Sequence, residues 1–90
     1  MEIMVLKVAA HSQPATVAGA IANNIREAKS VEIIAMGPQV VNQAVKALAI
    51  ARDYLKGESI DLACVPCFMH LMIDGVEKSA IKLVVIKHGT

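Results

Sequence analysis

Aromatic side chains are almost absent from this 90-residue chain, which has one tyrosine, one phenylalanine and no tryptophan. Tyr54 and Phe68 are too few to form the row of rings on which many proteins stack single-stranded bases.

The chain also lacks the phosphate loops G-x-x-x-x-G-K and G-x-G-x-x-G, a serine nucleophile elbow, and a carboxylate pair at acid–base spacing. The sequence therefore predicts a protein that is not an enzyme.

No apolar run approaches the ~20 residues that a membrane helix requires. The longest candidates are residues 44–51, interrupted by Lys46, and residues 62–73, interrupted by Pro66 and His70. Nevertheless, 56% of the residues are hydrophobic and the mean hydropathy is +0.54. We expect this apolar surplus to be buried in a homodimer or higher homo-oligomer rather than in lipid.

Signals for export and for strong electrostatic attraction are also missing. The N-terminal run M-E-I-M-V-L-K has no basic leader, so we do not expect a signal peptide. With only two cysteines, a reduced cytoplasm is the expected compartment. The net charge of +1 offers no general attraction to nucleic acid, so the local distribution of charge has to decide that question.

Apolar periodicity and turn residues divide the chain into six elements of one domain, residues 1–90. Ser12 is predicted to cap the first helix, with Pro14 in its first turn, and Gly57 to cap the end of the second. The expected elements are a strand at 3–8, a helix from the H-S-Q-P loop to about 29, a strand at 31–36, a helix from Gly37-Pro38 to about 56, and strands at 60–73 and 76–87 joined by an Asp74-Gly75 turn.

This order predicts a two-layer α/β (α+β) sandwich, in which two helices cover one face of a four-stranded mixed sheet. Two consecutive β-α-β steps favour parallel strands with right-handed crossovers, and the hairpin adds an antiparallel strand. Alternation along the strands predicts that eight residues face the helices: Met4, Leu6, Val8, Ile33, Leu62, Ile81, Leu83 and Val85. The opposite face is then also apolar, with Ile3, Val5, Ile34, Met36, Val65, Val84 and Ile86, diluted by Lys7, Glu32, Asp61 and Lys82.

The run C-V-P-C-F-M-H concentrates possible redox and metal ligands, but its setting favours ordinary buried thiols. A redox C-x-x-C pair needs a helix N-terminus, whereas Cys64 and Cys67 lie in an extended segment. Three strand steps span roughly 10 Å, beyond the ~7 Å limit for a disulfide, and turn the two side chains to opposite faces. Zinc binding that includes His70 would need a turn and a fourth ligand. We therefore expect neither a metal nor a cofactor, and Pro66 indicates an edge strand.

Polar residues gather where the first two strands end and the two helices begin. Helix N-termini expose backbone N–H groups and the positive end of the helix dipole, which suits phosphate. If the third strand runs parallel to the first two, His70 and Lys78 reach the same edge. The last thirteen residues, K-S-A-I-K-L-V-V-I-K-H-G-T, add three lysines and no acid. The alternative is that Ser12 only caps a helix and Lys46 is only solvated.

Three stretches carry a resemblance to a known family: L-K-V-A-A-H-S-Q-P-A-T-V-A-G-A-I-A, V-N-Q-A-V-K-A-L-A-I-A-R and I-D-G-V-E-K-S-A-I-K-L-V-V. With the strands between them, they resemble the stage V sporulation protein S family, which belongs to the Alba-like nucleic-acid-binding group. The resemblance implies a β-α-β-α-β-β fold, a dimer or larger assembly, and a regulatory role without catalysis. Carried over by position, the nucleic-acid contacts it implies are His11, Ser12, Gly37, Asn42, Gln43, Lys46, Lys78 and Lys82.

The chain departs from that family at several of these positions. The family loop usually carries lysine where this chain has His11, and Pro38-Gln39 replaces a turn of small residues. In the family, alanine and an acid are common at the positions that Cys67 and His70 occupy here.

The leading hypothesis is a cytoplasmic, non-enzymatic protein that binds DNA or RNA. The alternative is an assembly or protein-interaction module that uses the apolar sheet face without nucleic acid.

Overall fold

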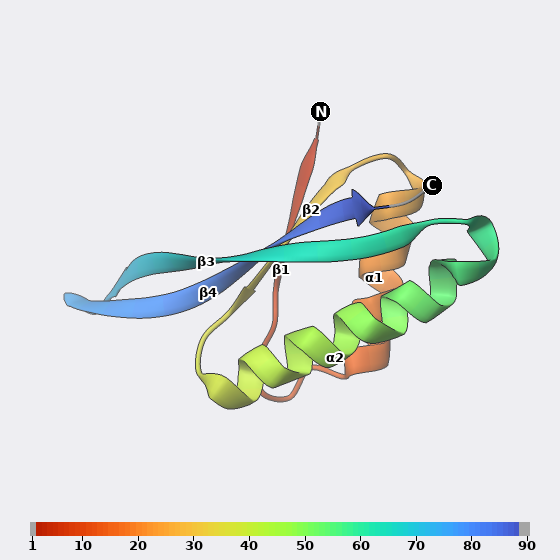
Figure 1. Cartoon of the computed structure of the whole chain (residues 1–90). Helices are drawn as coiled ribbons and strands as arrows, with labels where there is room; N and C mark the ends of the chain where they lie inside the picture. Colours follow the sequence, from red (N-terminus) through yellow and green to blue (C-terminus); the bar gives the residue numbers. More distant parts are fainter. Residues whose placement is uncertain (1, 89–90) are drawn as a thin grey trace.

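The computed structural model describes residues 2–88, and its elements follow the predicted order β-α-β-α-β-β. They are β1 (Ile3–Lys7), α1 (Pro14–Arg26), β2 (Ser30–Ala35), α2 (Pro38–Leu55), a short 3-10 turn (Lys56–Glu58), β3 (Asp61–Ile73) and β4 (Val76–His88), as Figure 1 shows. The two-layer α+β fold with a four-stranded mixed sheet is therefore confirmed.

Two helix ends differ from the prediction. Helix α1 stops at Arg26 rather than near residue 29, because Ala28 takes a left-handed conformation with φ of 61°. Gly57 does not cap α2: it lies inside the 3-10 turn, and Ser59, with φ of 58°, takes the left-handed position instead. In both places a non-glycine residue reverses the chain, which residue preferences alone do not indicate.

The strands lie in the order β1-β2-β4-β3. Strands β1 and β2 are parallel, whereas β4 pairs antiparallel with both β2 and β3. Strand β3 therefore runs in the same direction as the first two strands, as the site prediction required. It is an edge strand, and its register stays unbroken where Pro66 faces Leu83. An edge strand tolerates proline because one of its sides makes no ladder hydrogen bonds.

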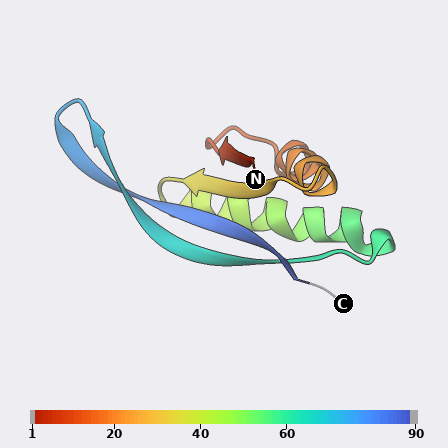
Figure 2. The same ribbon diagram turned by 90° about the horizontal axis from the view of Figure 1, so that it is seen from above.

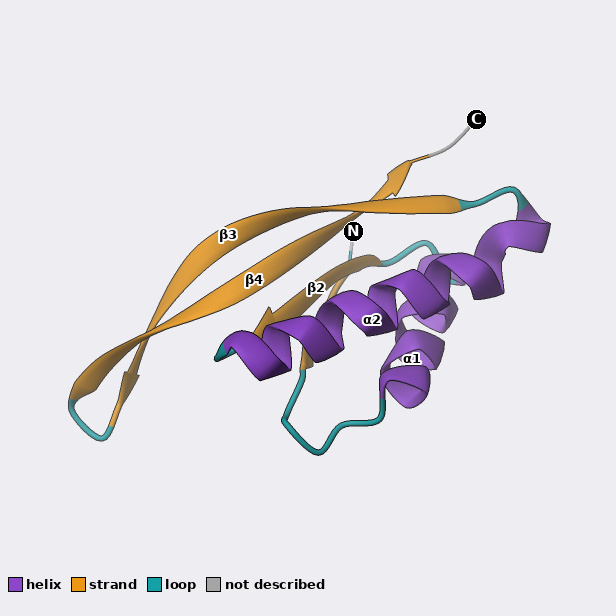
Figure 3. Cartoon of the chain, turned by 60° about the horizontal axis from the view of Figure 1, so that its bottom comes forward, coloured by secondary structure: helices purple, strands orange, loops and turns teal. Residues whose placement is uncertain are grey.

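The core lies between the sheet and the helices, which pack against each other as they cross (Figure 3). Its largest fully buried side chains are Ile21, Val31, Ile33 and Leu55. Small residues at helical spacing, among them Ala44, Ala47 and Ala51 on α2, let backbones approach closely. Within residues 2–88, neither helix combines the length and apolarity needed to cross a membrane.

The β3–β4 hairpin continues well beyond the rest of the sheet (Figure 2). The last pair between β2 and β4 is Ala35 with Ile81, so residues 69–73 and 76–80 pair only with each other. We call residues 69–80 the hairpin arm. At its tip, Asp74 and Gly75 have φ of 51° and 76°. Two positive φ values are typical of a type I′ turn, so the Asp-Gly hairpin is confirmed.

Within residues 2–88, no layer covers the face of the sheet turned away from the helices. The predicted alternation is confirmed except at Asp61, which was expected on this face but whose carboxylate pairs with Arg52 of α2. Val31, Ile33 and Ala35 are fully buried toward the helices, whereas Ile3 and Val5 on the other side are 56% and 45% exposed. We call this second side the open face, after its residues Ile3, Val5, Lys7, Glu32, Ile34, Ala63, Val65, Cys67, Lys82, Val84 and Ile86.

Candidate nucleic-acid interface

The start of α2 presents backbone donors without a side-chain cap. Gly37, with φ of 91° and ψ of 152°, turns the chain out of β2, and Pro38 opens the helix. The N–H of Val41 donates to the Gly37 carbonyl at 2.9 Å, the first bond of the helix. No side chain accepts from the first turn, and Pro38 has no N–H, which leaves the N–H groups of Gln39 and Val40 outside the helical ladder.

Ser12 forms hydrogen bonds within the loop after β1 and does not cap α1. The Ala9 N–H donates to the Ser12 hydroxyl at 3.0 Å, and the Ser12 N–H donates to the Ala9 carbonyl at 3.0 Å. Gln13 occupies the N-cap position of α1 and its side chain makes no cap bond. The prediction that Ser12 caps α1 is therefore wrong, because the hydroxyl bonds backward to the loop. His11 is exposed beside it.

The predicted α2 residues lie on two sides of the helix. Asn42 and Lys46 are exposed one turn apart, on the side opposite the buried Ala44 and Leu48. Gln43 is half-buried and follows on a neighbouring flank. Asn42 and Lys46 thus form an exposed polar edge along the first two turns, next to the free N–H groups of the helix start.

The predicted hairpin lysines point to the other side of the sheet. Lys82 faces Ile34 on β2 and Cys67 on β3, and Ile34 also faces Lys7 on β1. Lys7 and Lys82 therefore flank Ile34 in one row of the open face. Lys78 lies four residues before Lys82 on β4. It is on the same side of the strand, roughly 13 Å nearer the tip of the hairpin. The sequence predicted Lys7 only as an isolated charge on the apolar face. Its place in one row with Lys82 depends on the order of the strands, which alternation within one strand does not reveal.

An apolar groove separates the start of α2 from the hairpin. It has a volume of about 550 Å³ and is lined by Gly37, Pro38, Val41, Asn42, Val45, Phe68, Ser79, Ala80 and Ile81. Phe68 is 78% exposed at its edge. Local sequence patterns do not indicate this groove, because only the folded order of strands and helices brings Phe68 and Val41 to line the same space. Of the predicted contact residues, Gly37 and Asn42 line this groove, whereas Lys78 and Lys82 lie on the other side of the hairpin.

The C-x-x-C segment is a regular strand with two free thiols. Cys64 faces Val85 and packs against the core, whereas Cys67 faces Lys82 on the open face. Both are half-buried rather than buried as predicted, since β3 lies at the sheet edge. His70 lies in the arm, where its Nδ1 is 3.2 Å from Oε1 of Glu77. Residues 2–88 contain no cluster of three or more His, Cys, Asp or Glu side chains suited to a metal ion.

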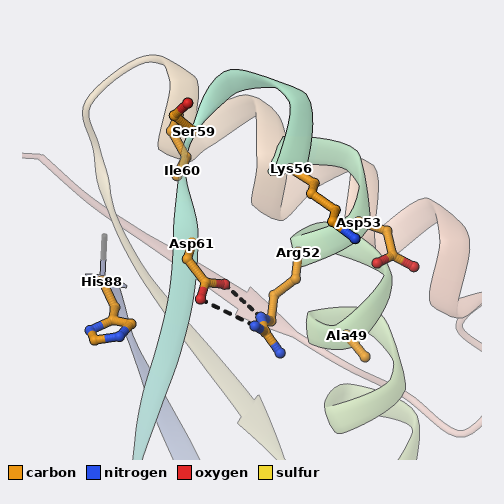
Figure 4. A pocket seen from close by; sticks show the side chains of 8 residues that line it. All are labelled: Ala49, Arg52, Asp53, Lys56, Ser59, Ile60, Asp61 and His88. Atoms are coloured by element: carbon orange, nitrogen blue, oxygen red, sulfur yellow. Dashed lines mark hydrogen bonds and ion pairs between the residues drawn. The ribbon is translucent and has the colours of Figure 1, made fainter. Parts of the chain in front are cut away.

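A second groove lies at the far end of α2, and its arginine is already paired (Figure 4). Arg52 donates from Nε and Nη2 to the two carboxylate oxygens of Asp61, at 2.7 and 3.1 Å. These bonds, with a bond from the Leu62 N–H, hold the pKa of Asp61 below its usual range. His88 lies on the other side of Asp61 (Figure 4). Alternation along β3 predicted Asp61 on the face opposite the helices and so did not indicate this pair.

Ion pairs concentrate at the same end of the molecule. Arg26 donates to both carboxylate oxygens of Glu58 at 2.8 to 3.1 Å, which lowers the pKa of Glu58. By contrast, none of the lysines near the helix start, the open face and the arm makes an ion pair with a described residue: Lys7, Lys46, Lys78 and Lys82. Lys56, which lines the Arg52 groove, also makes no ion pair with a described residue.

Element order, helices on one face and a mixed sheet place this protein in the Alba-like class of two-layer α+β proteins. The chain belongs to the stage V sporulation protein S family, whose family model matches residues 4–88. Membership of this family links the protein to sporulation.

Proposed function

We propose that this protein is a non-enzymatic regulator, acting in the cytoplasm, that binds DNA or RNA through the start of α2 and the hairpin arm. The observation that carries the proposal is the set of lysines without carboxylate partners at this end of the molecule. Phosphate affinity comes largely from such cations, because each phosphate contact releases condensed counterions.

The α2 start supplies the directional part of the contact. The free N–H groups after Gly37 and Pro38 offer hydrogen bonds to a phosphate oxygen, and the helix dipole adds positive potential. Lys46 adds a full charge about two turns further along, and Asn42 lies between them. His11 and Ser12 extend the contact from the loop after β1, where the first parallel strand ends at the same edge.

The hairpin arm supplies a second contact. Lys78 lies in the arm, and Lys82 lies on the same side of β4, two residues beyond the base of the arm, so both can reach phosphates that α2 does not touch. Few side chains here suit readout of base edges, and aromatic side chains are scarce. Recognition therefore depends on backbone charge and shape rather than base sequence.

Fluorescence anisotropy with labelled 20-base-pair DNA and RNA duplexes tests this proposal. We expect binding at low salt whose affinity falls linearly on a log–log plot as salt increases. Two duplexes of unrelated sequence should bind with similar affinity. Unchanged anisotropy of both duplexes at low salt and high protein concentration would overturn the proposal.

A second candidate function is assembly through the open face, without nucleic acid. The exposure of Ile3, Val5, Val65 and Ile86, each above 40%, favours it, since monomers rarely expose such a continuous apolar surface. A variant with Ile34→Glu and Val84→Glu separates the two functions. Retained duplex binding by a soluble monomer supports the nucleic-acid function, whereas loss of a protein partner with no duplex binding in either form supports assembly.

A further inference from the structure

Phe68 is the most exposed large apolar residue within residues 2–88, at 78%. It lies in one row with Ile81 of β4 and Ala35 of β2, and Ala35 is buried toward the helices. Residues in one row share a face of the sheet, so Phe68 projects to the helix side and not to the open face. There it borders the apolar groove at the start of α2. The ring is therefore available to another molecule in that groove.

The groove beside Phe68 has an uncharged interior. Among the described residues, no lysine, arginine, histidine or carboxylate lines it. Asn42 and Ser79 contribute an amide and a hydroxyl, each of which can donate and accept hydrogen bonds. The volume of about 550 Å³ falls in the range of roughly 300–1,000 Å³ that is typical of small-ligand sites. Its nine lining residues are fewer than the roughly 20–30 that each partner brings to a stable protein interface.

Positive groups surround this neutral interior. Lys46 is exposed on the α2 side, and the N–H groups of Gln39 and Val40 lie outside the helical ladder at the α2 start. On the hairpin side, the carboxylate of Glu77 is held by His70, whose Nδ1 lies 3.2 Å from its Oε1. A neutral groove with a positive rim complements a group that is itself uncharged but is attached to an anion.

We propose that this groove binds one unpaired nucleobase of a bound nucleic acid, which stacks on the ring of Phe68. A nucleobase is flat and neutral with donors and acceptors at its edge, and the adjoining phosphates carry the charge that the rim attracts. One ring suffices for one base, and stacking accepts any base. An already unpaired base leaves its stack at low cost, so bulges and loops bind in preference to a continuous duplex. This binding mode rests on the proposed function and adds which nucleic-acid structure the protein prefers.

A single bulged nucleotide tests the groove by fluorescence anisotropy. Three labelled 20-base-pair duplexes, of the kind (DNA or RNA) that binds more tightly, are compared: fully paired, with one bulged nucleotide, and with one bulged abasic site. The abasic bulge keeps the backbone charge and the bend but removes the base. The bulged nucleotide should lower Kd roughly tenfold relative to both other duplexes, within the range that one base stacked on an aromatic side chain contributes. Equal Kd values for the two bulges overturn the proposal.

The fully paired duplex separates this proposal from the proposed function. If it binds and the bulged base adds nothing beyond the abasic bulge, the proposed function stands and the binding mode is wrong. If none of the three duplexes binds at low salt, both are wrong.

Variants of Phe68 assign the preference to its ring, and its exposure lets them fold. Phe68→Leu keeps an apolar side chain without a ring and should bind all three duplexes with similar Kd, whereas Phe68→Tyr should keep the preference. Tyr54→Leu removes the other ring, near the end of α2, and should leave the preference unchanged. A preference that survives in Phe68→Leu overturns the proposal. So does altered sedimentation of Phe68→Leu without nucleic acid, because a second copy would then occupy the groove.

Discussion

Gly37 connects β2 to α2 in a backbone conformation that only glycine adopts at low cost. Its φ of 91° and ψ of 152° lie outside the regions open to residues with a Cβ. The space around it is open, with nothing within 4 Å of an added Cβ, so the restriction comes from the backbone alone. This residue therefore fixes where the α2 start and its free N–H groups lie.

We expect Gly37→Ala to lower the free energy of unfolding by about 1–3 kcal/mol, because alanine has to adopt this conformation. Urea denaturation measures the effect. Gly19→Ala is the matched control: this position also has no atom within 4 Å of an added Cβ, but it lies inside α1. Alanine there should raise stability by about 0.5–1 kcal/mol. Equal effects at both positions would contradict the backbone argument.

Lysine substitutions test the proposed phosphate contacts one at a time. Lys46→Ala and Lys82→Ala should each weaken duplex binding and reduce the slope of log affinity against log salt by roughly 0.9, the value for one lost phosphate contact. Anisotropy titrations at four salt concentrations give the slope. Lys56→Ala is the control, because Lys56 is an exposed lysine at the opposite end of the molecule. A slope that changes equally for Lys56→Ala indicates only a general effect of net charge.

Single residues were the hardest features to predict from the sequence. Ser12 precedes a proline-started helix, the pattern of an N-cap, yet its hydroxyl accepts a bond from Ala9 within the loop. Lys7 appeared to be an isolated charge, and only the pairing of β1 with β2 and of β2 with β4 places it in one row with Lys82. Such roles depend on partners far apart in the chain, which local patterns do not contain.

Elements were predicted well, because their signals are local. Apolar spacing and the breakers Pro14, Gly37-Pro38 and Asp74-Gly75 gave all six elements, most within one or two residues. The order of strands in the sheet is not local: β4 inserts between β2 and β3. For this reason the length of the hairpin was predictable, whereas its projection beyond Ile81 was not.

The hairpin arm can be shortened without touching the core. Deleting residues 70–73 and 76–79 removes four ladder pairs and keeps the Asp74-Gly75 turn between Met69 and Ala80. The deleted residues pair only with each other, so the urea midpoint should stay close to that of the wild type. Loss of Lys78 should weaken duplex binding roughly tenfold near 0.1 M salt, the contribution of about one phosphate contact.

Two results would contradict this account of the arm. Unchanged duplex affinity of the shortened protein would show that the arm makes no contact. Global unfolding of the shortened protein, seen by circular dichroism, would show that the arm is part of the folded core.

The Arg52–Asp61 pair stabilises the junction between the end of α2 and β3 in a pH-dependent way. A carboxylate whose pKa is lower in the folded than in the unfolded chain stabilises the fold above its unfolded pKa of about 3.9. That contribution disappears as the pH falls through the lowered folded pKa. The wild type should therefore lose more of its urea midpoint between pH 5 and pH 2 than Asp61→Asn. The effect is small, because both side chains are exposed.

A control for this prediction lies on the same groove. Asp53 makes no ion pair with any residue of 2–88, so Asp53→Asn should keep the wild-type pH dependence. If Asp61→Asn and the wild type lose stability in parallel, the pair contributes nothing measurable to the fold.

On the scale of the whole molecule, charge is sorted between two ends and apolar surface between two faces. The arginines pair with Glu58 and Asp61 at the end of α2, whereas unpaired lysines lie around the helix start and the arm. The helices cover one face of the sheet and leave the other exposed. This division separates the start of α2, proposed as a nucleic-acid contact, from the exposed apolar face of the sheet.

The central claim is that nucleic acid contacts the start of α2 and the hairpin arm, and amide NMR during titration with a 20-base-pair duplex tests it most directly. We predict the largest shifts at Gln39, Val40 and Lys46 and along residues 76–82, with small shifts at His11 and Ser12. Amides near Arg52 and Asp61 should stay in place. Shifts confined to the Arg52–Asp61 end, or no shifts at low salt, would contradict the account.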